Sequence, residues 1–312
     1  MLCRVKDNFR DNIGEDKVKK EKFQEGLDLL KQPVLPLVSM LQFLFQLSGP
    51  QAKIEDIISE MPEPVETAHA VYPHPGNLLR RHLDLLRLLE GDVDSREMGT
   101  IELQVVDEAS QPLDAMTACA AMISQRILED ELEVINSLLC ALCNCTLCCV
   151  GPDKAMRQDF FEIPLREQET ELFSLTRHDT VTSRSNLAIN PDMDDDTLRI
   201  NGHPLYQNAN QGTDPELFRW RNGWSMILPK ESSCPALEQN GRCGVYSSRP
   251  QVCRRPQIFS YILERTEEPK QYMLRNSLLA VTDCPYVQLL QGEIVAYASA
   301  CELDCILREN KK

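Results

Sequence analysis

The sequence has 312 residues, of which 42% are hydrophobic and 26% charged, and its formal net charge is −15. This composition is enough for a hydrophobic core and argues against wholesale disorder. A strongly acidic surface repels the phosphates of nucleic acids and anionic lipid headgroups. We therefore expect neither nucleic acid nor a membrane as a partner.

The N-terminal segment predicts a cytoplasmic protein. Met1–Lys31 is charged throughout and has neither the apolar run nor the small-residue cleavage site of an export signal. The longest apolar stretches, Val34–Leu47 and Val134–Val150, are interrupted by polar residues, so neither predicts a membrane-spanning helix.

Residues 1–132 predict a helical region. Phe23, Leu27 and Leu30 recur at helical spacing, which predicts a helix over 18–30. The same periodicity, interrupted by prolines, predicts further helices over 37–47, 54–61, 78–89 and about 112–139. The region carries no catalytic signature, so we interpret it as a packing or protein-partner-binding domain.

Residues 133–312 predict a second, loop-rich domain. Trp224–Leu228 and Tyr272–Val281 have the composition of strands, and the acidic run Asp192–Asp196 is typical of a solvated loop. Gln291–Leu307 predicts a helix that places Cys301 and Cys305 one turn apart. The expected fold class is α+β: a helical N-terminal region, then a cysteine-cluster domain with short strands and a C-terminal helix.

The cysteines are the main functional signal. The chain has 13, and all except Cys3 and Cys119 lie between residues 140 and 305. We interpret those two as small buried side chains. In a reducing compartment, clustered thiols more often bind metal or do redox chemistry than form disulfides.

The first cluster holds five thiols within ten residues. If it ends the preceding helix, Cys145 faces both Cys148 and Cys149; if it is a loop, the short spacers still let neighbouring sulfurs converge on one ion. Zinc and cubane iron–sulfur clusters each draw on four such ligands. Adjacent cysteines rarely chelate the same ion, which favours different metals for Cys148 and Cys149. The cluster comprises Cys140, Cys143, Cys145, Cys148 and Cys149.

The second cluster is more widely spaced, and each of its cysteines lies beside a turn-forming residue, as ligands presented from loops often do. It comprises Cys234, Cys243, Cys253 and Cys284. Arginines close by in the sequence would offset the negative charge that several thiolates leave around one dication. These are Arg242, Arg249, Arg254 and Arg255.

The two clusters together resemble the YkgJ-type cysteine-cluster family of zinc or iron chelators. That family has a CxxCxxCC block followed by a stretch like CPxL…GxCxIYxxRPxxCRxFP. Residues 145–149 match the CxxCC end of the first block, whereas Leu142 stands where the family has its first cysteine. Residues 234–254 match the second, although the ending after Cys253 lacks the aromatic. The resemblance implies a zinc or iron centre, and some members are described as flagellin lysine N-methylases.

The leading hypothesis is an intracellular protein with one or two thiolate-ligated centres, either zinc or iron–sulfur. The alternatives are a metal-dependent group-transfer or redox enzyme of the lysine N-methylase-like type, a partner-binding helical module braced by a structural metal, and a thiol redox sensor. No catalytic residue is predicted. The predicted metal ligands are Cys143, Cys145, Cys148, Cys149, Cys234, Cys243, Cys253 and Cys284, with Cys140, Cys301 and Cys305 as further candidates.

Overall fold

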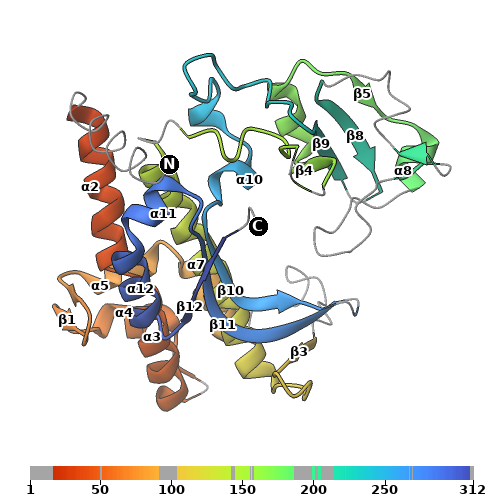
Figure 1. Ribbon diagram of the computed structural model, residues 1–312. Coiled ribbons are helices and arrows are strands. Elements are labelled where there is room, and N and C mark those ends of the chain that lie inside the picture. The colour runs from red at the N-terminus through yellow and green to blue at the C-terminus, as the bar shows by residue number, and fades with distance from the viewer. Residues whose placement is uncertain are drawn as a thin grey trace. The chain divides into compact units, whose positions relative to one another are not determined.

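A computed structural model provides the fold (Figure 1). It describes residues 17–49, 51–90, 104–141, 145–154, 156, 158–185, 199–200, 203–204, 214–221, 223–266, 268 and 270–309. The predicted loop over Asp192–Asp196 lies outside these residues, as do Cys3 and Cys143.

The chain packs into two compact units. The first joins residues 1–143 to residues 257–310, and the second is formed by residues 144–256 between them. The predicted boundary between residues 132 and 133 falls inside a helix of the first unit, and a separate function for residues 133–312 stays a prediction.

The helices of the first unit surround a long central helix, α7 (Ala115–Cys140). Asp114 caps α7, because its carboxylate accepts hydrogen bonds from the N–H groups of Met116 and Thr117, both at 3.0 Å. The buried face of α7 includes Ile127 and Ile135, at the spacing of a helix packed on one side. The earlier helical segments are α2 (Lys17–Lys31), α3 (Leu35–Ser48), α4 (Ile54–Glu60), α5 (Pro75–Arg80), α6 (Leu83–Leu86) and the 3₁₀ turn η1 (Arg87–Glu90).

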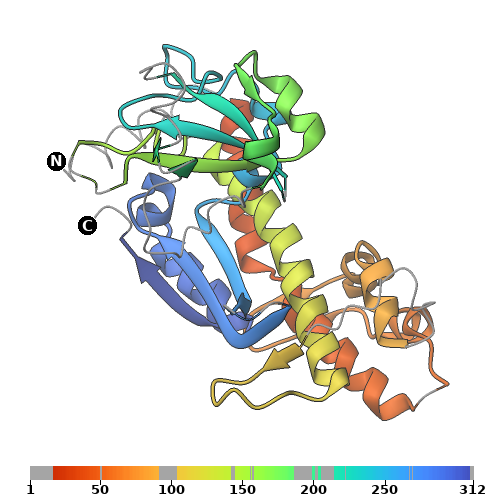
Figure 2. The same ribbon diagram turned by 90° about the vertical axis from the view of Figure 1, so that its right-hand side faces the viewer.

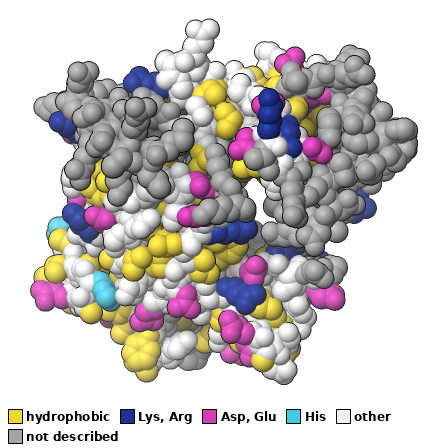
Figure 3. All heavy atoms as spheres, viewed as in Figure 1, with side chains coloured by type: hydrophobic (Ala, Val, Ile, Leu, Met, Phe, Trp, Pro, Cys, Tyr) yellow, Lys and Arg dark blue, Asp and Glu magenta, His cyan; other side chains and the backbone are white. Residues whose placement is uncertain are grey.

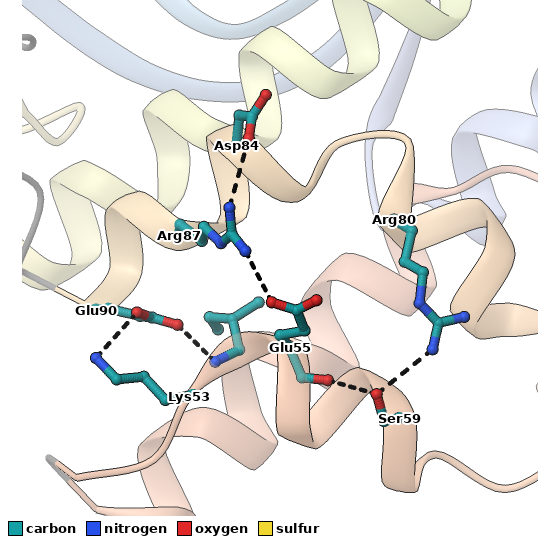
Figure 4. A network of polar contacts seen from close by, with 8 residues as sticks. Lys53, Glu55, Ser59, Arg80, Asp84, Arg87 and Glu90 are labelled. Carbon is teal, nitrogen blue, oxygen red and sulfur yellow. Dashed lines mark hydrogen bonds and ion pairs between the residues drawn. The ribbon is translucent and has the colours of Figure 1, made fainter.

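Carboxylates tie these short helices together (Figure 4). Glu90 accepts the N–H of Ile54 at 2.7 Å, which satisfies a backbone donor at the start of α4, and it pairs with Lys53 at 3.3 Å. Arg87 pairs with Glu55 at 2.7 Å across the same junction. A small antiparallel pair, β1 (Val65–Glu66) and β2 (Val71–Tyr72), precedes α5.

A largely buried glutamate on α7 joins three helices of the first unit. Glu131 accepts the N–H of Val34, at the start of α3, at 3.0 Å through Oε1, and the hydroxyl of Tyr297 at 2.6 Å through Oε2. Burial raises the pKa of the Glu131 carboxyl to about 7, although both hydrogen bonds oppose the rise. The fully buried Tyr72 donates to the carbonyl of Pro33 at 2.8 Å, just before α3.

The sheet of the first unit is built from distant parts of the sequence. Its order is β10–β11–β12, and β3 pairs with the far end of β11. The β10–β11 pair is antiparallel, whereas β3 and β12 both run parallel to β11. Asn136 of α7 bonds both backbone groups of Ile258 and thereby fastens the helix to β10. The strands are β3 (Gln104–Val106), β10 (Ile258–Arg265), β11 (Gln271–Val281) and β12 (Asp304–Arg308).

The C-terminal segment corrects the sequence-based prediction. The predicted helix over 291–307 ends as α12 (Gln291–Ala300), which follows α11 (Pro285–Leu289), and residues 304–308 form β12. Glu302 adopts a left-handed φ of 57°, while the N–H groups of Glu302 and Leu303 bond the carbonyls of Ser299 and Ala298. This is a Schellman-type helix end. Cys301 and Cys305 are therefore not one helical turn apart.

The second unit contains a four-stranded sheet of order β4–β9–β8–β5, whose strands are labelled in Figure 1. Its strands are β4 (Phe160–Leu165), β5 (Arg177–His178), β8 (Glu216–Trp220) and β9 (Gly223–Pro229). Short elements surround it: η2 (Glu167–Leu172), α8 (Val181–Ser185), the pair β6 (Arg199–Ile200) and β7 (His203–Pro204), η3 (Tyr246–Ser248) and α10 (Gln251–Arg254).

One core cluster of the second unit lies against a face of this sheet. Leu165, Leu217, Trp224 and Met226 alternate inward along three adjacent strands, as the period of two requires. Cys234 packs against this core, so the first cysteine after β9 is anchored to the sheet.

The predicted α+β class is confirmed, and so is the C-terminal helix, although it is shorter than expected. Acidic and basic side chains are interspersed over the described surface in Figure 3. Among the described helices, none has the length and apolar character that a bilayer crossing requires.

Candidate metal centre

The second unit brings together four cysteines from three separate segments. Burial, together with the neighbouring thiols of Cys234, Cys149 and Cys243, raises the pKa of the Cys253 thiol to about 12. Such an effect requires sulfurs that lie near one another in a partly dehydrated place. Cys149, Cys234, Cys243 and Cys253 form what we call the thiol cluster.

A backbone bridge holds Cys149 beside Cys234. The N–H of Cys234 donates to the carbonyl of Cys149 at 2.8 Å, and Val150 pairs with Ser233 in an isolated antiparallel bridge. The N–H of Gly151 donates to the carbonyl of Ser232 at 2.9 Å. The turn after α7 is thus fixed against the segment that leaves β9.

Gly151 permits this close approach. A Cβ at this position would lie 2.0 Å from the carbonyl oxygen of Pro229, which belongs to the backbone of β9. We expect Gly151→Ala to destabilise the second unit by about 1–3 kcal/mol, because backbone must move to make room. Both tryptophans of the chain, Trp220 and Trp224, lie in this unit, so thermal unfolding followed by tryptophan fluorescence measures the effect.

The control for that substitution is Gly292→Ala. No atom lies within 4 Å of the position of its Cβ, and it belongs to α12 in the first unit. A fluorescence midpoint that is the same for both variants and the wild type would contradict the close packing at Gly151.

A compact loop brings Cys243 back to Cys234. Leu237 and Cys243 form an antiparallel bridge, and the N–H of Gly244 donates to the carbonyl of Ala236 at 2.8 Å. Gly241 turns this loop with a left-handed φ of 79°. The interval of nine residues therefore places the two cysteines at neighbouring positions.

The Cys234 thiol faces donors from its own backbone. Burial raises its pKa and the Cys243 thiol adds to the rise, whereas hydrogen bonds from the N–H groups of Ala236 and Leu237 lower it. N–H groups aimed at sulfur stabilise a thiolate and orient it toward a metal. The donor chemistry at Cys234 therefore fits a metal-bound cysteine.

Cys253 lies on α10, which is fastened to η2. The N–H of Gln251 donates to Glu169 at 2.8 Å, and the side chain of Gln251 accepts from Arg166 at 2.5 Å. These bonds fix the short helix that carries Cys253.

Arg249 is the cation built into the cluster. It is only 7% exposed, its guanidinium carbon lies 3.8 Å from the centre of the Tyr246 ring, and its Nε donates to the carbonyl of Tyr246 at 3.2 Å. Its positive charge lowers the pKa of Cys253. Of the four arginines close to the thiols in the sequence, Arg249 is the one that is buried.

The four cysteines of the thiol cluster are neighbours, but their sulfurs do not form a closed coordination shell. In the described parts of the chain, no three Cys, His, Asp or Glu side chains stand in a metal-holding group. Cysteine side chains rotate between staggered positions about χ1, so their sulfurs can turn toward a cation.

The other predicted ligands fall into two groups. Cys145 and Cys148 lie in the segment that leads to Cys149, with Cys148 exposed and Cys145 half-buried. The remaining described candidates belong to the first unit: Cys140 at the end of α7, Cys284 before α11, Cys301 after α12 and Cys305 in β12. The ligand role of both groups stays a prediction.

Two sulfurs of the first unit have identified surroundings. Burial and the nearby Glu131 carboxylate raise the pKa of Cys301, and a hydrogen bond with Tyr297 opposes part of the rise. Cys119, predicted to be a small buried side chain, is half-buried on α7, and burial raises its pKa.

Comparison with known proteins gives a match that covers the part of the chain that holds the thiol cluster. Residues 139–277 match a family model described as "CxxCxxCC: Putative zinc- or iron-chelating domain". This match confirms the resemblance. The CxxCxxCC segment spans less than half of the chain, contains the whole thiol cluster and ends before Cys284. No curated protein and no solved structure matches the chain.

Proposed function

We propose that the second unit binds a zinc ion or an iron–sulfur cluster through the thiolates of Cys149, Cys234, Cys243 and Cys253. The observation that carries the proposal is the set of backbone bridges that place Cys149 and Cys243 beside Cys234. The effect of all three thiols on the pKa of Cys253 supports it. These thiols are half-buried. Thiolates that repel one another are stabilised when a cation lies between them, because the cation inverts the local pKa shifts.

The number of thiols matches the needs of either centre. Structural zinc takes four ligands in a tetrahedron, and cubane clusters are held by four cysteines. Zinc would chiefly brace the loops that follow β9, whereas an iron–sulfur cluster would add electron transfer. Cys143, Cys145 and Cys148, which precede Cys149, are the ligands that we propose for a second centre.

The proposed setting is the cytoplasm, where reduced thiols remain available to metal. The helical region of residues 1–132 is the part that we propose to contact a protein partner.

The metal is identified by purifying the full chain without oxygen. Stoichiometric zinc in a colourless protein supports a structural site, and iron with labile sulfide in a brown protein supports a cluster. A chain that retains neither metal, and binds neither when it is supplied under reducing conditions, would contradict the proposal.

Arg249 provides a test of the electrostatics. We expect Arg249→Gln to weaken metal binding about tenfold or more, because it removes the buried charge that offsets the thiolates. Arg249→Lys keeps the charge and should recover part of the loss. The measurement is a competition titration with a chromophoric chelator, and the exposed Arg242→Gln serves as the control. Equal affinities for all three variants would exclude a role for Arg249.

A further inference from the structure

The last strand of the chain forms an edge of the first unit's sheet. β12 pairs in parallel with β11 from Ser277–Asp304 to Val281–Arg308, and no described strand pairs with its other side. Figure 2 shows β12, in dark blue, at the margin of this sheet. Ile306 is 46% exposed and Leu307 is 43% exposed. An exposed edge strand with apolar side chains is a template for pairing with another strand.

The backbone groups that face outward from this edge can be assigned. The N–H of Thr282 donates to the carbonyl of Arg308 at 2.9 Å, so the backbone of Arg308 faces β11. Backbone groups alternate sides along a strand. The N–H and C=O groups of Ile306 therefore also face β11. Those of Cys305 and Leu307 point to the open side of the strand.

The charges of β12 are arranged symmetrically about its centre. The strand reads Asp-Cys-Ile-Leu-Arg, with opposite charges at its two ends. Asp304 and Arg308 are both exposed, and neither has an ion-pair partner among the residues that the structure describes. A strand with this pattern is complementary to itself when it is turned around.

We propose that a second copy of this chain pairs with β12 in antiparallel register about a two-fold axis at Ile306. In this register Leu307 of one subunit exchanges two N–H···O bonds with Cys305 of the partner subunit. The two-fold axis repeats this pair, so Cys305 of the first subunit bonds in the same way to Leu307 of the partner subunit. Asp304 lies opposite Arg308 of the partner subunit, and the same pair recurs across the axis. An isologous contact of this kind closes on itself as a dimer.

The dimer rests on the first unit alone and is independent of the metal centre. Removing metal with a chelator leaves β12 unchanged, so the two proposals fail separately.

The charge pattern gives the decisive experiment. Sedimentation velocity of the full chain under reducing conditions should show a concentration-dependent dimer. Asp304→Arg and Arg308→Asp should each weaken it about tenfold, because each places like charges opposite one another twice. The double variant restores opposite charges and should recover dimerisation. Glu293→Arg, on the exposed side of α12, is the matched control and should leave the dimer intact.

Two outcomes would overturn the proposal: a wild-type chain that stays monomeric at every concentration reached, or a double variant that dimerises no better than the single ones.

A cross-link checks the register. Ile306 lies at a non-hydrogen-bonded position, where opposed Cα atoms are about 4.5 Å apart, within reach of a disulfide. Mild oxidation of Ile306→Cys should give a 306–306 peptide by mass spectrometry. The exposed Val295→Cys should give no 295–295 peptide, and a missing 306–306 link would exclude the register.

Discussion

Replacing Cys253 by serine should release the bound metal and lower the melting temperature of the second unit. The pKa of the Cys253 thiol is raised to about 12, because burial and three other thiols act on it together. Loss of one cysteine in four weakens metal binding by orders of magnitude. A metal ion present at 1,000 times its Kd stabilises the native state by about 4 kcal/mol, and the variant loses this stabilisation. The measurements are the metal-to-protein ratio and the tryptophan-fluorescence midpoint.

The comparison needs a chelator arm and a control. With metal stripped from both proteins, Cys253→Ser and the wild type should melt close together, since the stabilisation comes from the metal. Cys119→Ser, on α7 in the first unit, should keep both metal and midpoint. If Cys253→Ser retains a full complement of metal, Cys253 is not a ligand and the proposed centre is wrong.

Replacing Glu131 by glutamine should make the first unit more stable above neutral pH and leave it little changed at pH 5. The pKa of Glu131 is about 7 in the folded chain, against an ordinary value of 4.5. The folded state therefore holds the proton more tightly than the unfolded state. Its free energy of unfolding falls as pH rises between these two values, by up to about 1.4 kcal/mol per pH unit.

Above pH 7 the full cost of the buried charge, about 3 kcal/mol, is present in the wild type. Glutamine carries no charge and still offers a carbonyl oxygen to Val34 or Tyr297. Denaturation followed by ellipticity at 222 nm reports chiefly on the first unit, which holds the long helices α2, α3 and α7. Glu60→Gln, at an exposed position, is the control. If Glu131→Gln keeps the pH slope of the wild type, the carboxyl does not titrate near neutrality.

The elements governed by local patterns could be predicted from the sequence. The predicted helix over about 112–139 is α7, and its start is set by Asp114, a strong N-cap residue. The strands predicted over Trp224–Leu228 and Tyr272–Val281 lie within β9 and β11. In each of these segments the apolar residues recur at the spacing of a helix or of a strand, and this spacing is enough to specify the local conformation.

The C-terminal strand could not be predicted in the same way. Residues 301–308 continue an apolar pattern that is compatible with a helix, and only pairing with β11 makes residues 304–308 a strand. That partner lies far enough away in the sequence that no local signal reports it. The left-handed Glu302 ends the helix without the glycine that usually marks such a position.

The four cysteines of the thiol cluster are among the eight ligands predicted from the sequence, but their arrangement could not be predicted. The intervals between Cys234, Cys243 and Cys253 look irregular because a bridged loop and a short helix fold them back. The central position of Cys253 depends on bonds from α10 to η2, and that partner precedes it by some eighty residues. The buried arginine was one of four candidates, and only packing against Tyr246 identifies it.

X-ray absorption at the edge of the bound metal tests most directly whether cysteine thiolates hold it. We expect a first shell of sulfur at about 2.3 Å whose amplitude falls in Cys253→Ser. A first shell made only of nitrogen or oxygen at about 2.0–2.2 Å would contradict it, because the metal would then lie away from the thiol cluster.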